Sequence, residues 1–220
     1  MFINESKLLY RHMYEHMKII NSKKLIVVIG SGSANFREVI QPHIFRNIYR
    51  PFTQDPSVFM INLDFKESVG VDYVSDILNL DPKVAKKICN ANIYLVSNLL
   101  EHVTDIKVTI NKIAELMGQN SILICSGPVD YPYHPDPIDN LFRPKTAEDF
   151  KEYIGNLRLD SFNIYSNNMK FTSNSQNLKQ YLIAIYQLAK QYYSNPRKIL
   201  KISDDFQRHT YYIAILRNIS

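Results

Sequence analysis

The sequence predicts an α/β domain built on a doubly wound, mainly parallel sheet of seven strands with an antiparallel terminal strand. Short β-branched apolar runs alternate with segments of helical spacing from residue 24 onward. Such alternation favours parallel strands with helices on both faces of the sheet. The chain of 220 residues, 45% of them hydrophobic, is large enough to bury one core. We therefore expect a single domain over residues 1–220.

The apolar spacing of residues 5–20 predicts a lead-in helix within the first 22 residues, and residues 24–29 predict the first strand. A helix is expected from about Asn35, limited by Pro42 and Pro51. The following tract, 49–56, is expected at the surface. Further strands are expected at 58–64, 71–76, 92–97, 121–125, 157–165 and 209–216. Further helices are expected from Pro82, at 104–118, from Thr146 through a capping sequence, and at 177–193.

Composition excludes several classes of protein. The net charge of +5 is mild and indicates a solvated surface, which disfavours a nucleic-acid substrate. Cys89 and Cys125 form no paired motif and favour a reducing compartment. No apolar run approaches the roughly 20 residues that cross a bilayer, and the start of the chain lacks a signal-peptide core. We expect a cytoplasmic protein without membrane insertion. The sequence indicates no oligomeric state.

The first predicted strand ends in Gly30-Ser31-Gly32 and is followed by a helical pattern. Two glycines at such a turn let backbone amides approach a ligand closely at a helix N-terminus. Asn35 stands where the dinucleotide fingerprint requires a third glycine or an alanine, which disfavours NAD. The turn therefore predicts another nucleotide-like ligand.

Two acids follow the next strands. In a doubly wound sheet the ligand lies at the carboxyl ends of the strands. Asp64 after the second strand suits ribose hydroxyls, and Asp76 after the third suits an exocyclic amine, with the Ile77 amide for a ring nitrogen. Taken alone, either acid favours the interpretation as a solvated loop carboxylate. Together with the glycine turn, they predict an adenosine site.

Four segments, in this order, resemble the class I S-adenosylmethionine-dependent methyltransferases. They are the turn at Gly30, residues 71–80 (VDYVSDILNL), residues 96–103 (VSNLLEHV) and residues 131–144. The resemblance implies a Rossmann-like methyltransferase fold and S-adenosyl-L-methionine as cofactor. By resemblance, Gly30, Ser31 and Gly32 line the methionine half of the cofactor. Asp64 binds its ribose and Asp76 with Ile77 its adenine, and Asn98 at the end of the fourth strand completes the set.

The sequence departs from that family at two places. Val28 stands where the family commonly has an acid that positions the cofactor's amino group, and the interval from Gly32 to Asp64 is longer than usual. These departures keep a second reading open, in which the chain is a methyltransferase-fold binding protein with weak or no catalysis.

A Pro-rich loop at 127–144 follows the fifth strand and is expected to hold the methyl acceptor. His134 is the candidate catalytic base because it titrates near neutrality. The candidate substrate-binding residues are Tyr131, Tyr133, Asp136, Asp139 and Arg143. Asp136, Asp139 and Arg143 are equally able to pair with one another. The aromatic and polar mixture predicts a small or medium polar acceptor, such as a sugar or glycan intermediate, methylated on oxygen. Residues 166–196 are expected to be a variable insertion.

Two patterns raise the question of a metal. His12, Glu15 and His16 fit the H-x-x-E-H motif of zinc peptidases, although no later helix offers an obvious third ligand. Glu101-His102 resembles a metal-binding pair of some quinone-type O-methyltransferases, but Asn98 stands where those enzymes have another Glu. We expect no metal and keep a zinc metallopeptidase as a remote alternative.

Overall fold

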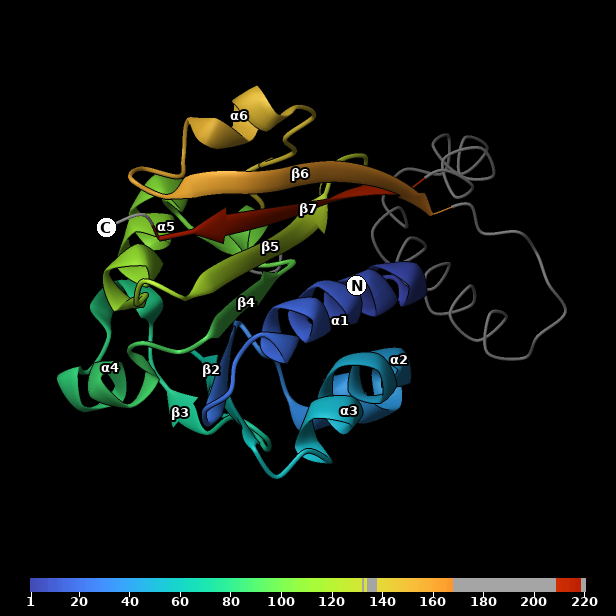
Figure 1. Cartoon of the computed structure of the whole chain (residues 1–220). Coiled ribbons are helices and arrows are strands. Elements are labelled where there is room, and N and C mark those ends of the chain that lie inside the picture. Colours follow the sequence, from blue (N-terminus) through green and yellow to red (C-terminus); the bar gives the residue numbers. More distant parts are fainter. Residues whose placement is uncertain (132, 134–137, 168–208, 219–220) are drawn as a thin grey trace, which may run out of the picture.

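A computed structural model describes residues 1–131, 133, 138–167 and 209–218 (Figure 1). The expected helix at 177–193 lies outside the described residues, as do His134 and Asp136. No helix in the described part of the chain is long and apolar enough to cross a membrane.

Seven strands form one sheet in the order β3-β2-β1-β4-β5-β7-β6. Strands β1 to β5 run parallel, β7 is antiparallel to β5, and β6 is antiparallel to β7. The predicted mainly parallel sheet with an antiparallel terminal strand is confirmed. The strands are β1 (Lys24–Ile29), β2 (Val58–Asp64), β3 (Tyr73–Val74), β4 (Ile93–Ser97), β5 (Ile122–Pro128), β6 (Arg158–Asn167) and β7 (His209–Arg217).

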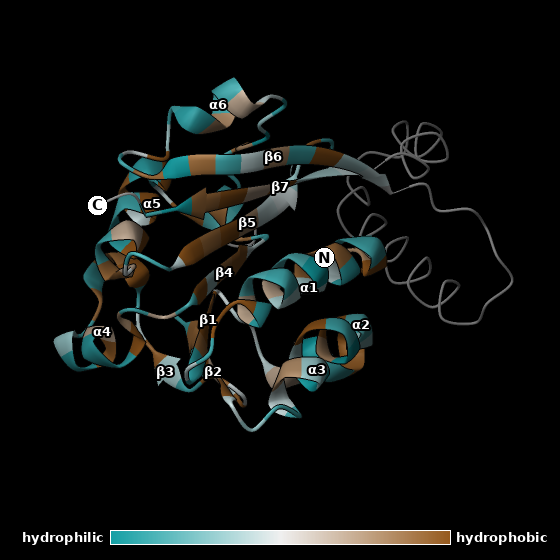
Figure 2. Ribbon diagram, viewed as in Figure 1, coloured by the Kyte–Doolittle hydropathy of each residue, from teal (hydrophilic) through white to brown (hydrophobic). Residues whose placement is uncertain are grey.

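Helices cover both faces of the sheet (Figure 1). One face packs against α1 (Ile3–Lys18), η1 (Phe36–Ile40), α2 (Pro42–Ile44), η2 (Phe45–Tyr49) and α3 (Arg50–Thr53). The other packs against α4 (Pro82–Ile88), α5 (Ile106–Leu116) and α6 (Ala147–Lys151). The central strands are mainly hydrophobic, whereas the helices carry both hydrophobic and hydrophilic residues (Figure 2). This pattern is expected for a sheet buried between two layers of helices. Two 3₁₀ turns, η3 (Ile77–Asn79) and η4 (Leu100–His102), follow β3 and β4.

For the segment between β1 and β2, one expectation is confirmed in part and another is wrong. Pro42 limits the first helix, since η1 ends at Ile40 and the chain bends at Gln41 before α2 begins. Pro51 does not limit a helix, because it lies in the first turn of α3, where a backbone N–H is not needed. The tract 49–56 is not at the surface throughout. Tyr49 and Phe52 are buried against the α1 side of the core. Helical continuation through η2 brings these rings inward, which residue composition alone does not reveal.

Helix α1 is held to the sheet by one apolar stripe, in which Leu9 and Met13 are fully buried. Leu9→Ala is expected to lower the free energy of unfolding by about 2–5 kcal/mol, because it leaves a cavity under the helix. The matched control is Ile19→Ala at the end of the same helix, where the side chain is 71% exposed. The control is expected to change stability by less than about 0.5 kcal/mol. Urea unfolding of both variants measures this, and equal losses would show that α1 does not pack as described.

Candidate functional site

The turn after β1 is fixed by the end of β2. Gly30 and Gly32 have φ angles of 69° and 65°, the left-handed region that glycine adopts without strain. The amides of Gly30 and Ser31 both donate to the carbonyl oxygen of Leu63, at 2.9 and 3.2 Å. The Gly32 amide donates to Oδ2 of Asp64 at 2.8 Å. A Cβ atom added at Gly30 would lie 2.9 Å from the Leu99 side chain, so the turn also packs closely against the end of β4.

Arg37 holds the same turn from its carbonyl side. Its guanidinium donates to the carbonyl oxygens of Ser31 (3.1 Å), Gly32 (2.6 Å) and Gly70 (2.8 Å) and lies over the Tyr49 ring. The residue is only 4% exposed. The sequence analysis did not single out Arg37. The one signal for it in the sequence is the presence of a charged residue on the side of the helix that is buried.

The two predicted acids lie on neighbouring strand ends. Asp64, 9% exposed, accepts the Gly32 amide on Oδ2 and the Lys66 amide on Oδ1. Asp76 caps η3 by accepting the Leu78 amide at 3.0 Å, and it is exposed. Pairing of Asp64 with Val74 in register places the carboxyl ends of β2 and β3 together, and Ile77 is buried beside them. Each carboxylate retains lone pairs for a ligand, since a carboxylate accepts about four hydrogen bonds.

The end of β4 is joined to α1 through a buried acid that sequence analysis did not single out. Oε1 of Glu5 accepts from Ser126 Oγ at 2.8 Å and from Asn98 Nδ2 at 2.9 Å, while Oε2 accepts the Phe2 amide at 2.9 Å. Glu5 is fully buried, and among the described residues no Lys, Arg or His forms an ion pair with it. Asn98 itself has a φ of 51°. The predicted site therefore contains a buried carboxylate held by neutral donors.

The loop residues predicted to bind an acceptor are only partly described, because His134 and Asp136 lie outside the described residues. Asp139 and Arg143 pair with each other at 2.7 Å, which is the alternative that the sequence left open. Tyr131 is partly buried, which raises the pKa of its hydroxyl, and Tyr133 is 54% exposed. The roles of these residues stay predictions.

Three buried polar atoms on or next to that loop have no hydrogen-bond partner among the described residues: Glu101 Oε2, Arg143 Nε and Tyr212 Oη. We call these three residues the Glu101 cluster. Burial raises the pKa of Glu101 from 4.5 to about 7, while the charges of His102 and Arg143 oppose that rise. Burial also raises the pKa of Tyr212 well above its usual value. The sequence offered no signal for the cluster, since Tyr212 comes from a distant strand.

Two residues of the zinc motif, His16 and Glu15, are engaged elsewhere. His16 Nε2 lies 3.1 Å from the carbonyl oxygen of Asn120, and Glu15 pairs with Lys18 at 3.1 Å on the exposed side of α1. Within the described residues no group of three His, Cys, Asp or Glu side chains is arranged to hold a metal ion.

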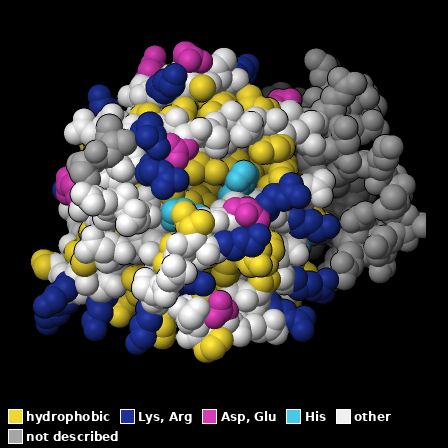
Figure 3. Space-filling view, viewed as in Figure 1, with side chains coloured by type: hydrophobic (Ala, Val, Ile, Leu, Met, Phe, Trp, Pro, Cys, Tyr) yellow, Lys and Arg dark blue, Asp and Glu magenta, His cyan; other side chains and the backbone are white. Residues whose placement is uncertain are grey.

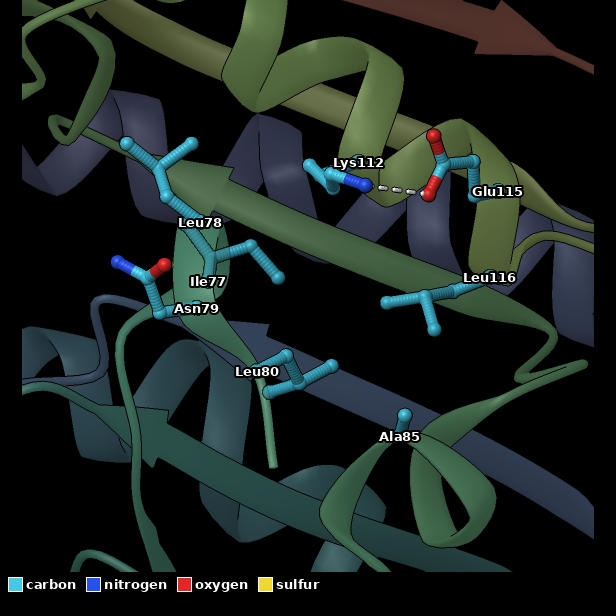
Figure 4. Close-up of a pocket in the computed structure, with 8 residues that line it drawn as sticks. All are labelled: Ile77, Leu78, Asn79, Leu80, Ala85, Lys112, Glu115 and Leu116. Atoms are coloured by element: carbon cyan, nitrogen blue, oxygen red, sulfur yellow. Dashed lines mark hydrogen bonds and ion pairs between the residues drawn. The ribbon is translucent and has the colours of Figure 1, made fainter. Parts of the chain in front are cut away.

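A separate pocket of about 250 Å³ opens between η3, α4 and α5 (Figure 4). Leu78, Leu80 and Leu116 line it, and the Lys112–Glu115 ion pair (2.9 Å) lies on its α5 side. Of the predicted cofactor-binding residues, Ile77 alone lines this pocket. It is therefore distinct from the strand ends that carry the glycine turn.

Solved structures with the same architecture are methyltransferase-like. Coclaurine N-methyltransferase, bound to N-methylheliamine and SAH, aligns with a TM-score of 0.53 and 12% identity over 97% of this chain and 70% of that one. The cyclase SpnF aligns with a TM-score of 0.57 and 12% identity over 95% of this chain and 80% of that one. Phosphoethanolamine N-methyltransferase 2 of Haemonchus contortus, in complex with S-adenosyl-L-methionine, aligns with a TM-score of 0.52 and 10% identity. That alignment covers 96% of this chain and 52% of that one. No protein-family model and no curated protein sequence matches the chain.

The class of fold follows from the order of the strands, from the antiparallel β7 and from these alignments. The chain has the fold of the class I S-adenosylmethionine-dependent methyltransferases. Identities of 10–12% establish the fold alone, and the cyclase shows that proteins of this fold differ in chemistry.

The raised pKa of Glu101 predicts a pH dependence of stability. Between about pH 4.5 and pH 7 the folded chain holds a proton on Glu101 that the unfolded chain has lost. Stability therefore falls as the pH rises across this range, by up to about 1.4 kcal/mol for each pH unit from this group. Glu101→Gln is expected to remove that component. Urea unfolding at a series of pH values measures both slopes, and parallel curves for the two proteins would contradict the assignment.

Proposed function

We propose that this chain is an S-adenosylmethionine-dependent methyltransferase that methylates a hydroxyl of a small or medium polar acceptor. The observation that carries the proposal is the contact between the Gly32 amide and Asp64 at 2.8 Å. It joins the glycine turn to the acid after β2, at the sheet edge where nucleotides bind in doubly wound folds. The bound cofactor supplies an activated methyl group, so the protein contributes mainly position and exclusion of water.

The residues at the strand ends suit the cofactor. Gly30, Ser31 and Gly32 are assigned to its methionine half, and the free lone pairs of Asp64 to the ribose hydroxyls. Asp76 with the Ile77 amide is assigned to adenine. Asp64 is suited to this role because Gly32 and Lys66 hold its carboxylate in place while a small part of it stays exposed.

Glu5 offers a solution to the missing acid at Val28. Val28 is 6% exposed and packs in the same apolar cluster as Leu9 of α1, so both belong to the α1 side of the sheet. Glu5 extends from that helix to Asn98 and Ser126 at the ends of β4 and β5. A buried carboxylate without a cationic partner favours a cation, and the cofactor carries an ammonium group. We assign Glu5 to that group in place of the acid that Val28 lacks.

The acceptor is assigned by the chemistry of the loop after β5. Tyr131 and Tyr133 offer aromatic faces for a sugar ring, and Asp139 with Arg143 offers polar contacts. On the face shown in Figure 3, Lys and Arg side chains are scattered with acidic ones between them, rather than gathered in a stripe that follows phosphates. These features support a saccharide-like acceptor over a nucleic acid.

A second candidate function is a binding protein of the same fold with weak or no catalysis. Val28 favours it, because the acid usually present at that position is absent. Binding of the cofactor without methyl transfer to any acceptor would support this second function.

Asp64→Ala is expected to weaken binding of S-adenosylhomocysteine about tenfold or more, since a hydrogen bond to a charged group is worth about 1.5–3 kcal/mol. Asp76→Ala is expected to weaken it in the same direction. The control is Glu67→Gln, which removes an equal charge from an exposed position three residues away. Isothermal titration calorimetry measures all four proteins, with thermal melting to verify their folding. A parent protein that does not bind S-adenosylhomocysteine would refute the proposed function.

A further inference from the structure

The Glu101 cluster has buried hydrogen-bonding capacity that the described part of the chain does not use. Glu101 is 1% exposed and Tyr212 is fully buried, yet Glu101 Oε2, Tyr212 Oη and Arg143 Nε have no partner. Buried polar groups in native proteins are nearly always paired, and exceptions often mark catalytic or ligand-binding positions. Three such atoms in one neighbourhood therefore point to a missing polar group.

The cluster lies at the ends of β4 and β5, where the cofactor's methyl group is expected. Glu101 is in η4, directly after β4. Tyr212 pairs with Gly127 near the end of β5, and a Cβ at Gly127 would lie 3.0 Å from the Tyr212 hydroxyl. Arg143 is held by Asp139 at 2.7 Å. The charges of both Glu101 and Arg143 act on Tyr212, so the three side chains share one environment.

The segment over the cluster is tied to η4. The Asn140 side chain donates to the carbonyl oxygens of Leu100 and Val103, at 2.8 Å each, and the Asn140 amide donates to that of Glu101 at 2.9 Å. Next to it, Leu141 has a φ of 60° and is 60% exposed, an unfavourable conformation for a branched side chain.

The unused atoms are complementary to a hydroxyl group. Arg143 Nε–H is a donor, the Tyr212 hydroxyl is able to donate, and Glu101 Oε2 accepts when it is ionised. A hydroxyl offers one proton to the carboxylate and two lone pairs to the donors. An ammonium group accepts from neither donor, and an ionised carboxylate has no proton for an ionised Glu101. A buried water offers the same complement as a hydroxyl.

We infer that Glu101 is the catalytic base for methyl transfer to a hydroxyl that Arg143 and Tyr212 position. The inference deepens the proposed function and rests on it. Glu101 takes the proton from the acceptor hydroxyl as the hydroxyl oxygen forms its bond to the methyl carbon. The pair of electrons from the broken carbon–sulfur bond stays on sulfur, which becomes a neutral thioether. Atoms and charge balance, because one carboxylate and one sulfonium are consumed.

The electrostatics around Glu101 suit this role. Burial and the charge of Glu5 raise its pKa, whereas His102 (Nε2 3.9 Å from Oε1) and Arg143 lower it, and the result is about 7. A base whose pKa lies near the working pH both accepts and releases its proton efficiently.

The first experiment compares variants for cofactor binding and turnover. Glu101→Gln keeps the shape of the side chain but cannot take a proton, and it is expected to lower turnover by about 10²–10⁴-fold. Its affinity for S-adenosylhomocysteine is expected to stay unchanged. Tyr212→Phe removes a hydroxyl that has no partner in the protein, so its melting temperature is expected to hold or rise while turnover falls. The control is Glu148→Gln, on exposed α6.

Methyl transfer from labelled S-adenosylmethionine is measured with hydroxyl probes (methyl α-glucopyranoside, glycerol and catechol) and with ethanolamine as an amine probe. The turnover of the parent protein is expected to rise with pH through about pH 7. A Glu101→Gln variant that keeps this rise and has full turnover would overturn the inference. Methylation of ethanolamine alone would overturn it, as would a loss of turnover confined to His134→Ala.

A second readout needs no acceptor. Infrared difference spectroscopy is expected to show one carboxyl that titrates near neutrality in the parent and is missing from Glu101→Gln. A carboxyl that stays in one form between about pH 5 and pH 9 would overturn the inference, because a base must gain and lose its proton. A crystal structure of the protein soaked with glycerol, in which only water contacts Glu101, would also overturn the inference. Failure of the proposed function is separate: there the parent does not bind S-adenosylhomocysteine at all.

Discussion

The geometry of the site depends on one hydrogen bond, from the Gly32 amide to the carboxylate of Asp64 at 2.8 Å. It joins the turn after β1 to the end of β2, and the parallel pairing of these strands brings the two together in register. Arg37 completes the arrangement by donating hydrogen bonds to the carbonyl oxygens on the other side of the turn. The backbone of the turn is thereby ordered before any ligand arrives, so binding does not bear the cost of ordering it.

Glu5 extends this organisation to the other half of the site. Through Asn98 and Ser126 it links the first turn of α1 to the ends of β4 and β5. A carboxylate buried without a cationic partner is costly, and the three neutral hydrogen bonds from Ser126, Asn98 and the Phe2 amide offset that cost only in part. Glu5 and Glu101 thus place two acids on the same edge of the sheet. One is held in place by its neighbours and the other has an unused oxygen, which gives them different roles.

Sequence patterns predicted the sheet well and the site only in part. β1 and β2 were predicted to the residue because each is a short, mainly apolar run that ends at a glycine or an acid. The path of residues 36–53 was not predicted, because proline is compatible with the first turn of a helix. Nothing in the composition marks the π-helical turns η1 and η2 either. Gly30 and Gly32 lie in the turn after β1 and Asp64 ends β2, and they were predicted from those positions. Glu5 contacts Asn98 across 93 residues of sequence, and no local pattern reports such a contact. The same reason hid the Glu101 cluster.

A crystal structure of the protein with S-adenosylhomocysteine tests the central claim most directly. The account predicts ribose hydroxyls on Asp64, adenine between Asp76 and Ile77, and the ammonium group near Glu5. It also predicts that the hydrogen bond between Gly32 and Asp64 persists. A ligand bound instead in the pocket between η3, α4 and α5, or an Asp64 carboxylate that contacts no ribose, would contradict the account.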